Sequence, residues 1–197
     1  MLLKQPSVAA FYDRIGSVYD DQLMGRADYQ VPRLLREEFA RRGFNYGSML
    51  DIGCGTGKIF CDLGARFTIH GIDPSAEMCQ IAASRGYSEV RYGFAEETLS
   101  TIPTKSVDHV IALSSLYFIE NIDLVVWESM RIARKSIFVS LEQFSERTKM
   151  SMEDQGMRIF NHARTKFDDS IVIQDTHLWT RPVERTKVFG NIAHKII

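Results

Sequence analysis

The sequence predicts a single α/β domain in which helices cover both faces of a mostly parallel β-sheet. A chain of 197 residues is long enough for one well-buried core and too short for two ordinary domains with a linker. Apolar, β-branched runs recur along it, separated by helical or short irregular stretches, which is typical of parallel strands joined by crossover helices. The predicted strands are residues 48–52, 67–72, 89–93, 107–113 and 137–141.

Two helical segments precede the first predicted strand. They span residues 7–20 and 29–42, and Gly43 ends the second one, because glycine is common just after the last turn of a helix. We therefore expect two N-terminal helices ahead of the sheet.

The pattern changes after the fifth predicted strand. Residues 144–164 have the pattern of a long helix, whereas residues 171–179 and 186–197 have the pattern of strands. Pro182 marks the connection between these two strands. Because the connection is short, we expect an antiparallel hairpin at the edge of the sheet.

The composition is that of a globular protein with almost balanced charges. There are 24 Lys and Arg residues against 25 Asp and Glu residues, which gives a formal net charge of −1. A near-neutral chain lacks the basic field of a protein that binds by neutralising phosphates. The composition therefore disfavours a nucleic-acid partner.

Three cysteines indicate the cellular compartment. Cys54, Cys61 and Cys79 are an odd number and lie close together, which is typical of a reducing compartment, and they lack the CxxC spacing of a zinc site. The first residues have no apolar signal segment, and no run of about 18 apolar residues occurs. We expect a cytoplasmic protein with no metal and no membrane partner.

A glycine-rich loop at residues 50–57, Leu-Asp-Ile-Gly-Cys-Gly-Thr-Gly, follows the first predicted strand. Glycines at alternate positions allow a tight turn and bring backbone N–H groups close to a ligand. A Walker phosphate loop is excluded, because Ile52 occupies its first glycine position and Ile59 its hydroxyl position. A dinucleotide-binding loop needs Gly or Ala where Lys58 stands, so that interpretation is weakened but stays open.

The pattern acid-x-Gly-x-Gly-x-Gly at residues 51–57 resembles the first motif of the class I S-adenosylmethionine-dependent methyltransferases. Further motifs follow in the family's order: an acid, Asp73, ends the second strand, residues 93–96 resemble the adenine-flanking segment, and residues 106–114 resemble the fourth-strand motif. The resemblance covers about residues 11–141. It implies a Rossmann-like three-layer sandwich with a seven-stranded, mostly parallel sheet whose last strand is antiparallel.

The resemblance also implies S-adenosylmethionine as cofactor, S-adenosylhomocysteine as product, and a set of binding residues. Asp51 would accept from the methionine ammonium, Asp73 from the ribose hydroxyls, and Glu96 or a backbone N–H would read the adenine amino edge. Strand-end or capping roles for the two aspartates, and a surface role for Glu96, stay open. The implied set is Tyr19, Asp51, Gly53, Cys54, Gly55, Asp73, Pro74, Met78, Ala95, Glu96 and Leu113.

The N-terminal segment, residues 11–21, resembles the tyrosine-bearing segment ahead of the core in small-molecule members of this family. Tyr12 and Tyr19 are seven residues apart and so share one helical face. These tyrosines could close over the cofactor or acceptor, or they could pack the helix on the core, and the two roles are compatible.

The expected single domain has three parts. They are N-terminal lid helices at 1–47, a cofactor-binding core at 48–142, and a helix plus strand hairpin at 143–197.

Methyl transfer requires alignment of the acceptor with the methyl group, exclusion of water and sometimes a base. The sequence assigns no catalytic residue; Tyr12, Tyr117 and His162 are the candidates. Residues 113–116, Leu-Ser-Ser-Leu, replace the Asn/Asp-Pro-Pro-Tyr/Phe motif of enzymes that methylate exocyclic amino groups of bases or glutamine. We therefore expect transfer to an oxygen, nitrogen or carbon of a small organic acceptor.

Two competing functions stay open. The strand, glycine loop and ribose acid would also suit an NAD-dependent oxidoreductase, although Lys58 counts against it. A non-catalytic partner protein that binds the cofactor on the same fold is the second competing function.

Overall fold

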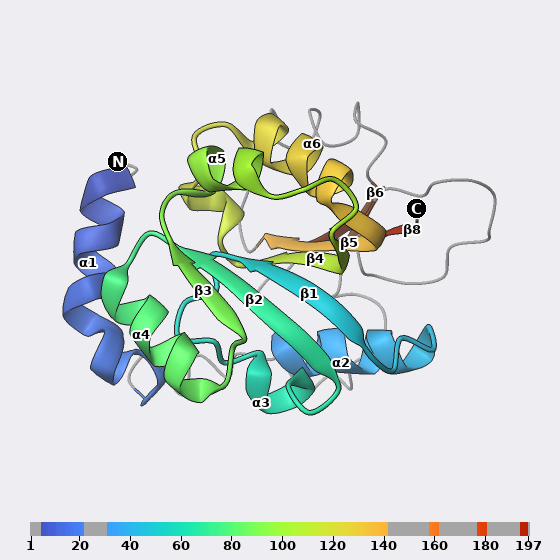
Figure 1. The fold of residues 1–197 in the computed structure, drawn as a ribbon, viewed down its shortest axis with the longest axis horizontal. Helices are drawn as coiled ribbons and strands as arrows, with labels where there is room; N and C mark the ends of the chain where they lie inside the picture. The colour runs from blue at the N-terminus through green and yellow to red at the C-terminus, as the bar shows by residue number, and fades with distance from the viewer. Residues whose placement is uncertain (1–4, 22–30, 142–157, 162–176, 181–193, 197) are drawn as a thin grey trace.

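The computed structural model describes residues 5–21, 31–141, 158–161, 177–180 and 194–196. Its strands are β1 (Gly47–Ile52), β2 (Phe67–Asp73), β3 (Glu89–Tyr92), β4 (Val107–Leu113), β5 (Ala133–Leu141), β6 (Arg158–Asn161), β7 (His177–Thr180) and β8 (His194–Ile196). They form one sheet in the order β3-β2-β1-β4-β5-β7-β6, and β8 also pairs with β5 (Figure 1). The helices are α1 (Gln5–Tyr19), α2 (Val31–Arg41), α3 (Phe60–Leu63), α4 (Ala76–Arg85), α5 (Ala95–Thr98) and α6 (Ile122–Ile132), with 3₁₀ turns η2 (Leu99–Thr101) and η3 (Leu116–Phe118).

The first five strands are parallel, which confirms the predicted parallel α/β sheet. β1 pairs with β2 on one side and with β4 on the other, so that Leu50 lies opposite both His70 and Val110. The strand order reverses at this point, because the chain moves outward from β1 to β3 and then returns to β4. In open parallel sheets, ligands bind at the carboxyl ends of the strands where the order reverses.

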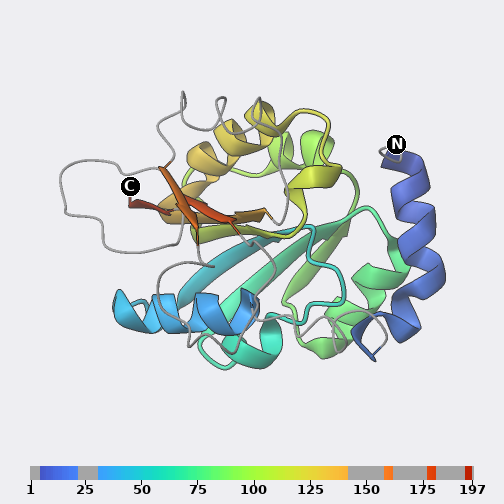
Figure 2. The ribbon, with the colours of Figure 1, turned by 180° about the vertical axis from the view of Figure 1, so that it is seen from behind.

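Helices cover both faces of the sheet and give the three layers that were predicted. Figures 1 and 2 show α2, α3 and α4 on one face and α5 and α6 on the other. α1 packs against α4 at the side of the molecule. The observed α1 and α2 correspond to the two predicted N-terminal helices.

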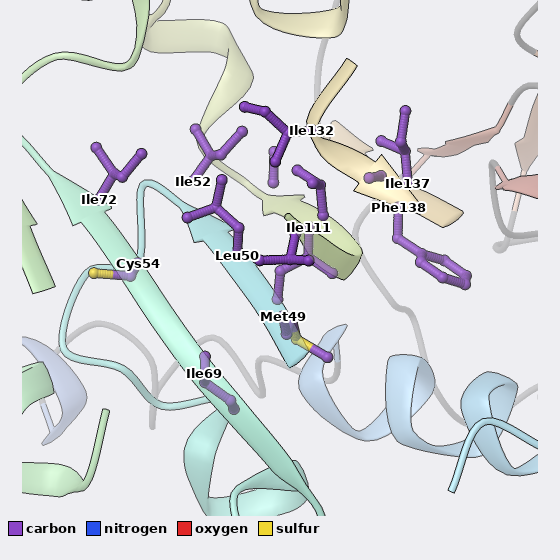
Figure 3. Packing of buried hydrophobic residues seen from close by; sticks show 14 of the residues in the cluster. Met49, Leu50, Ile52, Cys54, Ile69, Ile72, Ile111, Ile132, Ile137 and Phe138 are labelled. Carbon is purple, nitrogen blue, oxygen red and sulfur yellow. The ribbon is translucent and has the colours of Figure 1, made fainter. Parts of the chain in front are cut away.

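The core lies along the central strands β1, β4 and β5. Met49, Ile111 and Phe138 are fully buried there, and Figure 3 shows these side chains packed together. α2 contributes Phe39, whose ring centroid lies 4.8 Å from that of Phe138 and 5.4 Å from that of Phe67. α2 therefore covers the core, while α1 lies beside the site described below.

One predicted helix is wrong over its described part. Residues 158–161 fall within the predicted helix 144–164, but they form β6, which pairs antiparallel with β7 so that Ile159 lies opposite Trp179. The β-branched and aromatic residues of this segment suit a sheet edge, and strand pairing outweighs the local helical pattern. The rest of that predicted helix lies outside the described residues.

The C-terminal strands also differ from a simple hairpin. β7 and β8 fall in the two predicted strands, but each pairs antiparallel with a different part of β5: β7 with residues 139–141 and β8 with residues 136–138. The described segments therefore number eight strands rather than the predicted seven, because two short segments follow each other along β5. The last strand is antiparallel, as predicted.

Candidate functional site

A pocket opens at the carboxyl ends of β1, β2 and β4, where the strand order reverses. Its empty volume is about 1080 Å³ when the open mouth is included. All of the cofactor-binding residues expected from the sequence line it: Tyr19, Asp51, Gly53, Cys54, Gly55, Asp73, Pro74, Met78, Ala95, Glu96 and Leu113. The fold thus brings together residues that the sequence places on α1 and at or after the ends of four strands, β1, β2, β3 and β4.

The glycine loop between β1 and α3 forms the floor of the pocket. Gly53, Gly55 and Gly57 all have left-handed backbones, with φ of 69°, 53° and 71°. A side chain on Gly53 would bring its Cβ to 2.4 Å from the Ser115 Cβ, whereas a Cβ on Gly55 would meet nothing within 4 Å. The backbone of Gly55 therefore borders open space in the pocket, which a ligand can approach closely.

Asp73, at the end of β2, holds this loop in place. Its Oδ2 accepts from the Gly55 N–H over 2.8 Å and its Oδ1 accepts from the Ser75 N–H over 2.9 Å. Burial raises the pKa of Asp73 to about 6, and the two backbone hydrogen bonds oppose this rise. Each carboxylate oxygen has a second lone pair, so Asp73 can accept from a ligand hydroxyl while it holds the loop.

Asp51, at the end of β1, is buried below the loop and is bound by a residue that sequence reasoning missed. The hydroxyl of Tyr87 donates to its Oδ2 over 2.6 Å. Burial raises the pKa of Asp51 to about 7 and the charge of Asp73 adds to the rise, while the hydrogen bond from Tyr87 lowers it. A carboxyl group with this pKa can change its charge near neutral pH.

α1 is fixed to the site by two sets of polar contacts, which sequence reasoning also missed. Asp20 accepts from the Thr56 hydroxyl over 2.7 Å and from Arg85 over 2.6 Å. Near the middle of α1, Asp13 accepts from the Ser75 hydroxyl over 2.7 Å. The end of α1 is thereby joined to the glycine loop, and its middle to the start of α4.

Aromatic rings from α1 and η3 form another wall of the pocket. The ring centroid of Tyr12 lies 5.6 Å from that of Tyr19 and 5.7 Å from that of Phe118, and all three residues line the pocket. The two tyrosines share one helical face, as predicted. Of the other catalytic candidates, Tyr117 lies in η3 and His162 lies outside the described residues.

The β4 end of the pocket contains further residues outside the expected cofactor-binding set. Ser114 has a left-handed backbone with φ of 55°, and the Ser115 hydroxyl donates to the Ile52 carbonyl over 2.8 Å. Across the pocket, Glu96 accepts from the Glu120 N–H over 3.0 Å, which joins α5 to the segment before α6. The lining residues outside the expected cofactor-binding set and the catalytic candidates are Val8, Pro32, Ile52, Thr56, Lys58, Ile59, Ile72, Gly93, Phe94, Ser114, Ser115, Phe118 and Ile119.

The described residues contain neither a metal-binding cluster nor a membrane-spanning helix. Within the described ranges, no three His, Cys, Asp or Glu side chains are grouped so that they could hold a metal ion. None of the described helices combines the length and the apolar character needed to cross a membrane.

Comparisons with known proteins agree with this geometry. Residues 50–139 match the model of a family described as "Methyltransferase domain". No curated protein sequence matches the chain.

Solved structures give the same result for the fold. The magnesium protoporphyrin IX methyltransferase of Synechocystis PCC 6803 with bound SAM is 17% identical, with a TM-score of 0.67 over 91% of this chain and 96% of that one. A methyltransferase of Thermotoga maritima, described as a possible histamine N-methyltransferase, is 18% identical, with a TM-score of 0.58 over 94% and 95%. The [4+2]-cyclase SpnF is 22% identical, with a TM-score of 0.62 over 79% and 73%. Residues 50–139 are therefore similar to a methyltransferase domain, and the described sheet and helices have the Rossmann-like fold of these solved structures.

Proposed function

We propose that this protein binds S-adenosylmethionine in the pocket and transfers its methyl group to an oxygen, nitrogen or carbon of a small organic acceptor. The observation that carries the proposal is the convergence of the expected binding residues on one pocket at the carboxyl edge of the sheet. Residues from α1, from the glycine loop and from the ends of β2 and β4 meet there although they are far apart in the sequence.

The residues present fit this cofactor. The open space above Gly55 leaves room for a ligand against the loop backbone. Asp51 and Asp73 provide two separate carboxyl groups, suited to an ammonium and to a pair of ribose hydroxyls respectively. Pro74, Met78 and Ala95 give the apolar wall that an adenine ring needs. When bound, S-adenosylmethionine supplies a methyl group on a positively charged sulfur, which a nucleophilic acceptor atom can take by in-line displacement.

The chain's own contribution to the reaction is alignment and exclusion of water. Val8, Tyr12, Phe118 and Ile119 line the pocket with apolar and aromatic surface. A wall of this kind suits a small organic acceptor. Two structural neighbours are named for small molecules, magnesium protoporphyrin IX and, as a possible substrate, histamine.

The proposed setting is the cytoplasm. Cys54, Cys61 and Cys79 are all free, and Cys61 is exposed. Free thiols are typical of proteins that work in a reducing compartment.

The neighbour SpnF defines the main competing function, because a [4+2]-cyclase has the same fold. The fold therefore does not by itself fix the reaction. An NAD-dependent oxidoreductase and a non-catalytic partner protein that binds the cofactor also compete with methyl transfer.

The test is incubation of the protein with S-adenosylmethionine labelled on its methyl group and a mixture of small metabolites. We expect labelled product from the wild type and much less from Asp73→Ala. Asp62→Asn is the matched control and should retain wild-type activity, because Asp62 pairs with Arg36 on α2 outside the pocket. If the wild type binds the cofactor but gives no labelled product with any of the metabolites, the proposed methyl transfer is wrong.

A further inference from the structure

We propose that Tyr87 is a positioning residue of this site: its hydroxyl holds the Asp51 carboxylate in place to receive the ammonium group of the cofactor's methionine end. The proposal rests on the proposed function. It adds a residue that lies outside both the glycine motif and the pocket lining.

The contact between Tyr87 and Asp51 is short and buried. The Tyr87 hydroxyl donates to Asp51 Oδ2 over 2.6 Å, and the two residues are 6% and 4% exposed. Among the residues that the structure describes, Tyr87 is the one hydrogen-bond donor to this carboxyl group. Asp51 lines the pocket, whereas Tyr87 lies behind it. Tyr87 therefore does not touch a ligand in the pocket itself, and its hydroxyl acts on one through Asp51.

The fold makes room for the Tyr87 ring with two glycines. A Cβ on Gly57 would lie 2.7 Å from Tyr87 Cε2, and a Cβ on Gly71 would lie 3.1 Å from Tyr87 Cδ1. Gly86, with φ of 118°, ends α4 and turns the chain so that Tyr87 follows directly. The ring is thus held between the glycine loop and β2. The last glycine of the loop motif, Gly57, has a left-handed backbone, and a side chain there would also meet the Tyr87 ring.

The charges around Asp51 explain why such a donor matters. Asp51 faces the carboxyl group of Asp73, the thiol of Cys54 and the hydroxyl of Tyr87, while Arg85 acts on Tyr87 and Lys58 lines the same pocket. Burial and the charge of Asp73 both favour the protonated form of Asp51, whereas the hydrogen bond from Tyr87 favours the carboxylate. Loss of this hydrogen bond should keep Asp51 protonated up to a higher pH. In its protonated, neutral form Asp51 cannot form an ion pair with an ammonium group.

The experiment compares two ligands that differ in the methionine end. S-adenosylhomocysteine carries the ammonium, and 5′-methylthioadenosine has the same adenosine without the amino acid. Their affinities are measured by calorimetry from about pH 6 to about pH 8.5 for wild type and Tyr87→Phe. At pH 7 we expect Tyr87→Phe to bind S-adenosylhomocysteine about tenfold more weakly. The affinity of Tyr87→Phe for S-adenosylhomocysteine should rise with pH to a plateau. The pH of half-maximal affinity should lie about one unit above that of the wild type, because a tenfold change in affinity corresponds to about one pKa unit. Affinity for methylthioadenosine should stay unchanged.

A double-mutant cycle shows whether Tyr87 acts through Asp51. In an Asp51→Asn background, Tyr87→Phe should cause no further loss of S-adenosylhomocysteine affinity. Tyr46→Phe is the matched control, since Tyr46 is 78% exposed and outside the pocket. Equal losses for both ligands, or an unshifted pH profile in Tyr87→Phe, would overturn the proposal.

A measurement on the wild type keeps the proposal testable if Tyr87→Phe does not fold. Calorimetry at pH 7 in buffers of different ionisation enthalpy measures the protons released on binding. Because the pKa of Asp51 is about 7, the free protein holds this proton about half of the time, and binding of S-adenosylhomocysteine should release about half a proton. Methylthioadenosine should release none, and equal release for both ligands would overturn the proposal. If the wild type binds neither ligand, the proposed function itself is wrong.

Discussion

The backbone N–H of Gly55 donates to Oδ2 of Asp73 over 2.8 Å, which joins the glycine loop to the end of β2. The motif glycine and the acid that follows it along the chain are therefore one structural unit. Asp73 shapes the loop directly, in addition to its proposed contact with ribose. A substitution at Asp73 should accordingly affect both the loop and the ligand.

Replacing Asp73 with Ala should weaken binding of S-adenosylhomocysteine by about 1–3 kcal/mol, because hydrogen bonds to a charged group are lost. 5′-Methylthioadenosine should lose a similar amount, since both ligands carry the ribose. Calorimetry measures the affinities, and thermal unfolding should show a lower melting temperature because two backbone N–H groups lose their acceptor. Unchanged affinity for both ligands would mean that the ribose lies elsewhere.

The loop glycines Gly55 and Gly57 should respond differently to Ala. A Cβ on Gly55 meets nothing within 4 Å, so Gly55→Ala should fold with a cost of about 1 kcal/mol for its left-handed backbone and should bind S-adenosylhomocysteine poorly. A Cβ on Gly57 would lie 2.7 Å from Tyr87 Cε2 and 3.1 Å from the Ala82 Cα, so Gly57→Ala should lose more stability. Urea unfolding and calorimetry measure the two effects. Wild-type affinity in Gly55→Ala would contradict a ligand above the loop.

The ion pair of Asp20 and Arg85 should slow ligand release by fixing α1 to the loop. Burial alone would raise the pKa of Asp20, but hydrogen bonds from Thr56 and Arg85 outweigh it and lower the pKa. Because both side chains are about one quarter exposed, the pair should contribute about 1 kcal/mol or less. Stopped-flow release of S-adenosylhomocysteine should be several times faster in Asp20→Asn and in Arg85→Gln.

The double variant should be no faster than either single variant, because each single change already breaks the pair. Arg33→Gln, which breaks the Arg33–Glu37 pair on α2, is the matched control and should release the ligand at the wild-type rate. Additive effects of Asp20→Asn and Arg85→Gln would show that the pair does not act as a unit.

His109 should make the fold less stable in mild acid. Burial lowers the pKa of His109 to about 4, below the value of about 6.5 for an unfolded chain. Between these values the unfolded chain binds more protons, so stability should fall as the pH drops from about 6.5 to about 4, by up to about 3 kcal/mol. The raised pKa of Asp51 has the opposite effect, because through this group the folded chain gains stability as the pH falls below about 7. The contribution of His109 is therefore measured by comparing a His109 variant with the wild type.

Urea unfolding at several pH values tests this for His109→Gln and for the partly exposed His70→Gln. The loss of stability on acidification should be smaller in His109→Gln than in the wild type. An identical pH dependence in His109→Gln and the wild type would show that His109 does not carry the effect.

The features that the sequence predicted well are those set by local pattern. β4 begins and ends at the predicted residues, because its apolar run is bounded on both sides by polar and turn residues. The glycine loop and Asp73 were predicted because both lie at strand ends, where a short motif determines the backbone. Their shared pocket then follows from the parallel sheet.

The features that were missed depend on contacts between distant segments. Tyr87 follows α4 as an ordinary turn residue, and only the packing beside Gly57 and Gly71 brings it to Asp51. Arg85 looks like a helix-ending cation, yet it pairs with Asp20 from another helix. β6 lies in a segment with a helical pattern, and pairing with β7 determines its structure.

The most direct test of the proposed cofactor is calorimetric titration of the wild-type protein with S-adenosylhomocysteine and, separately, with NAD. We predict saturable binding of S-adenosylhomocysteine at one site per chain and no binding of NAD. Binding of NAD without binding of S-adenosylhomocysteine would contradict the proposed function and would favour an oxidoreductase.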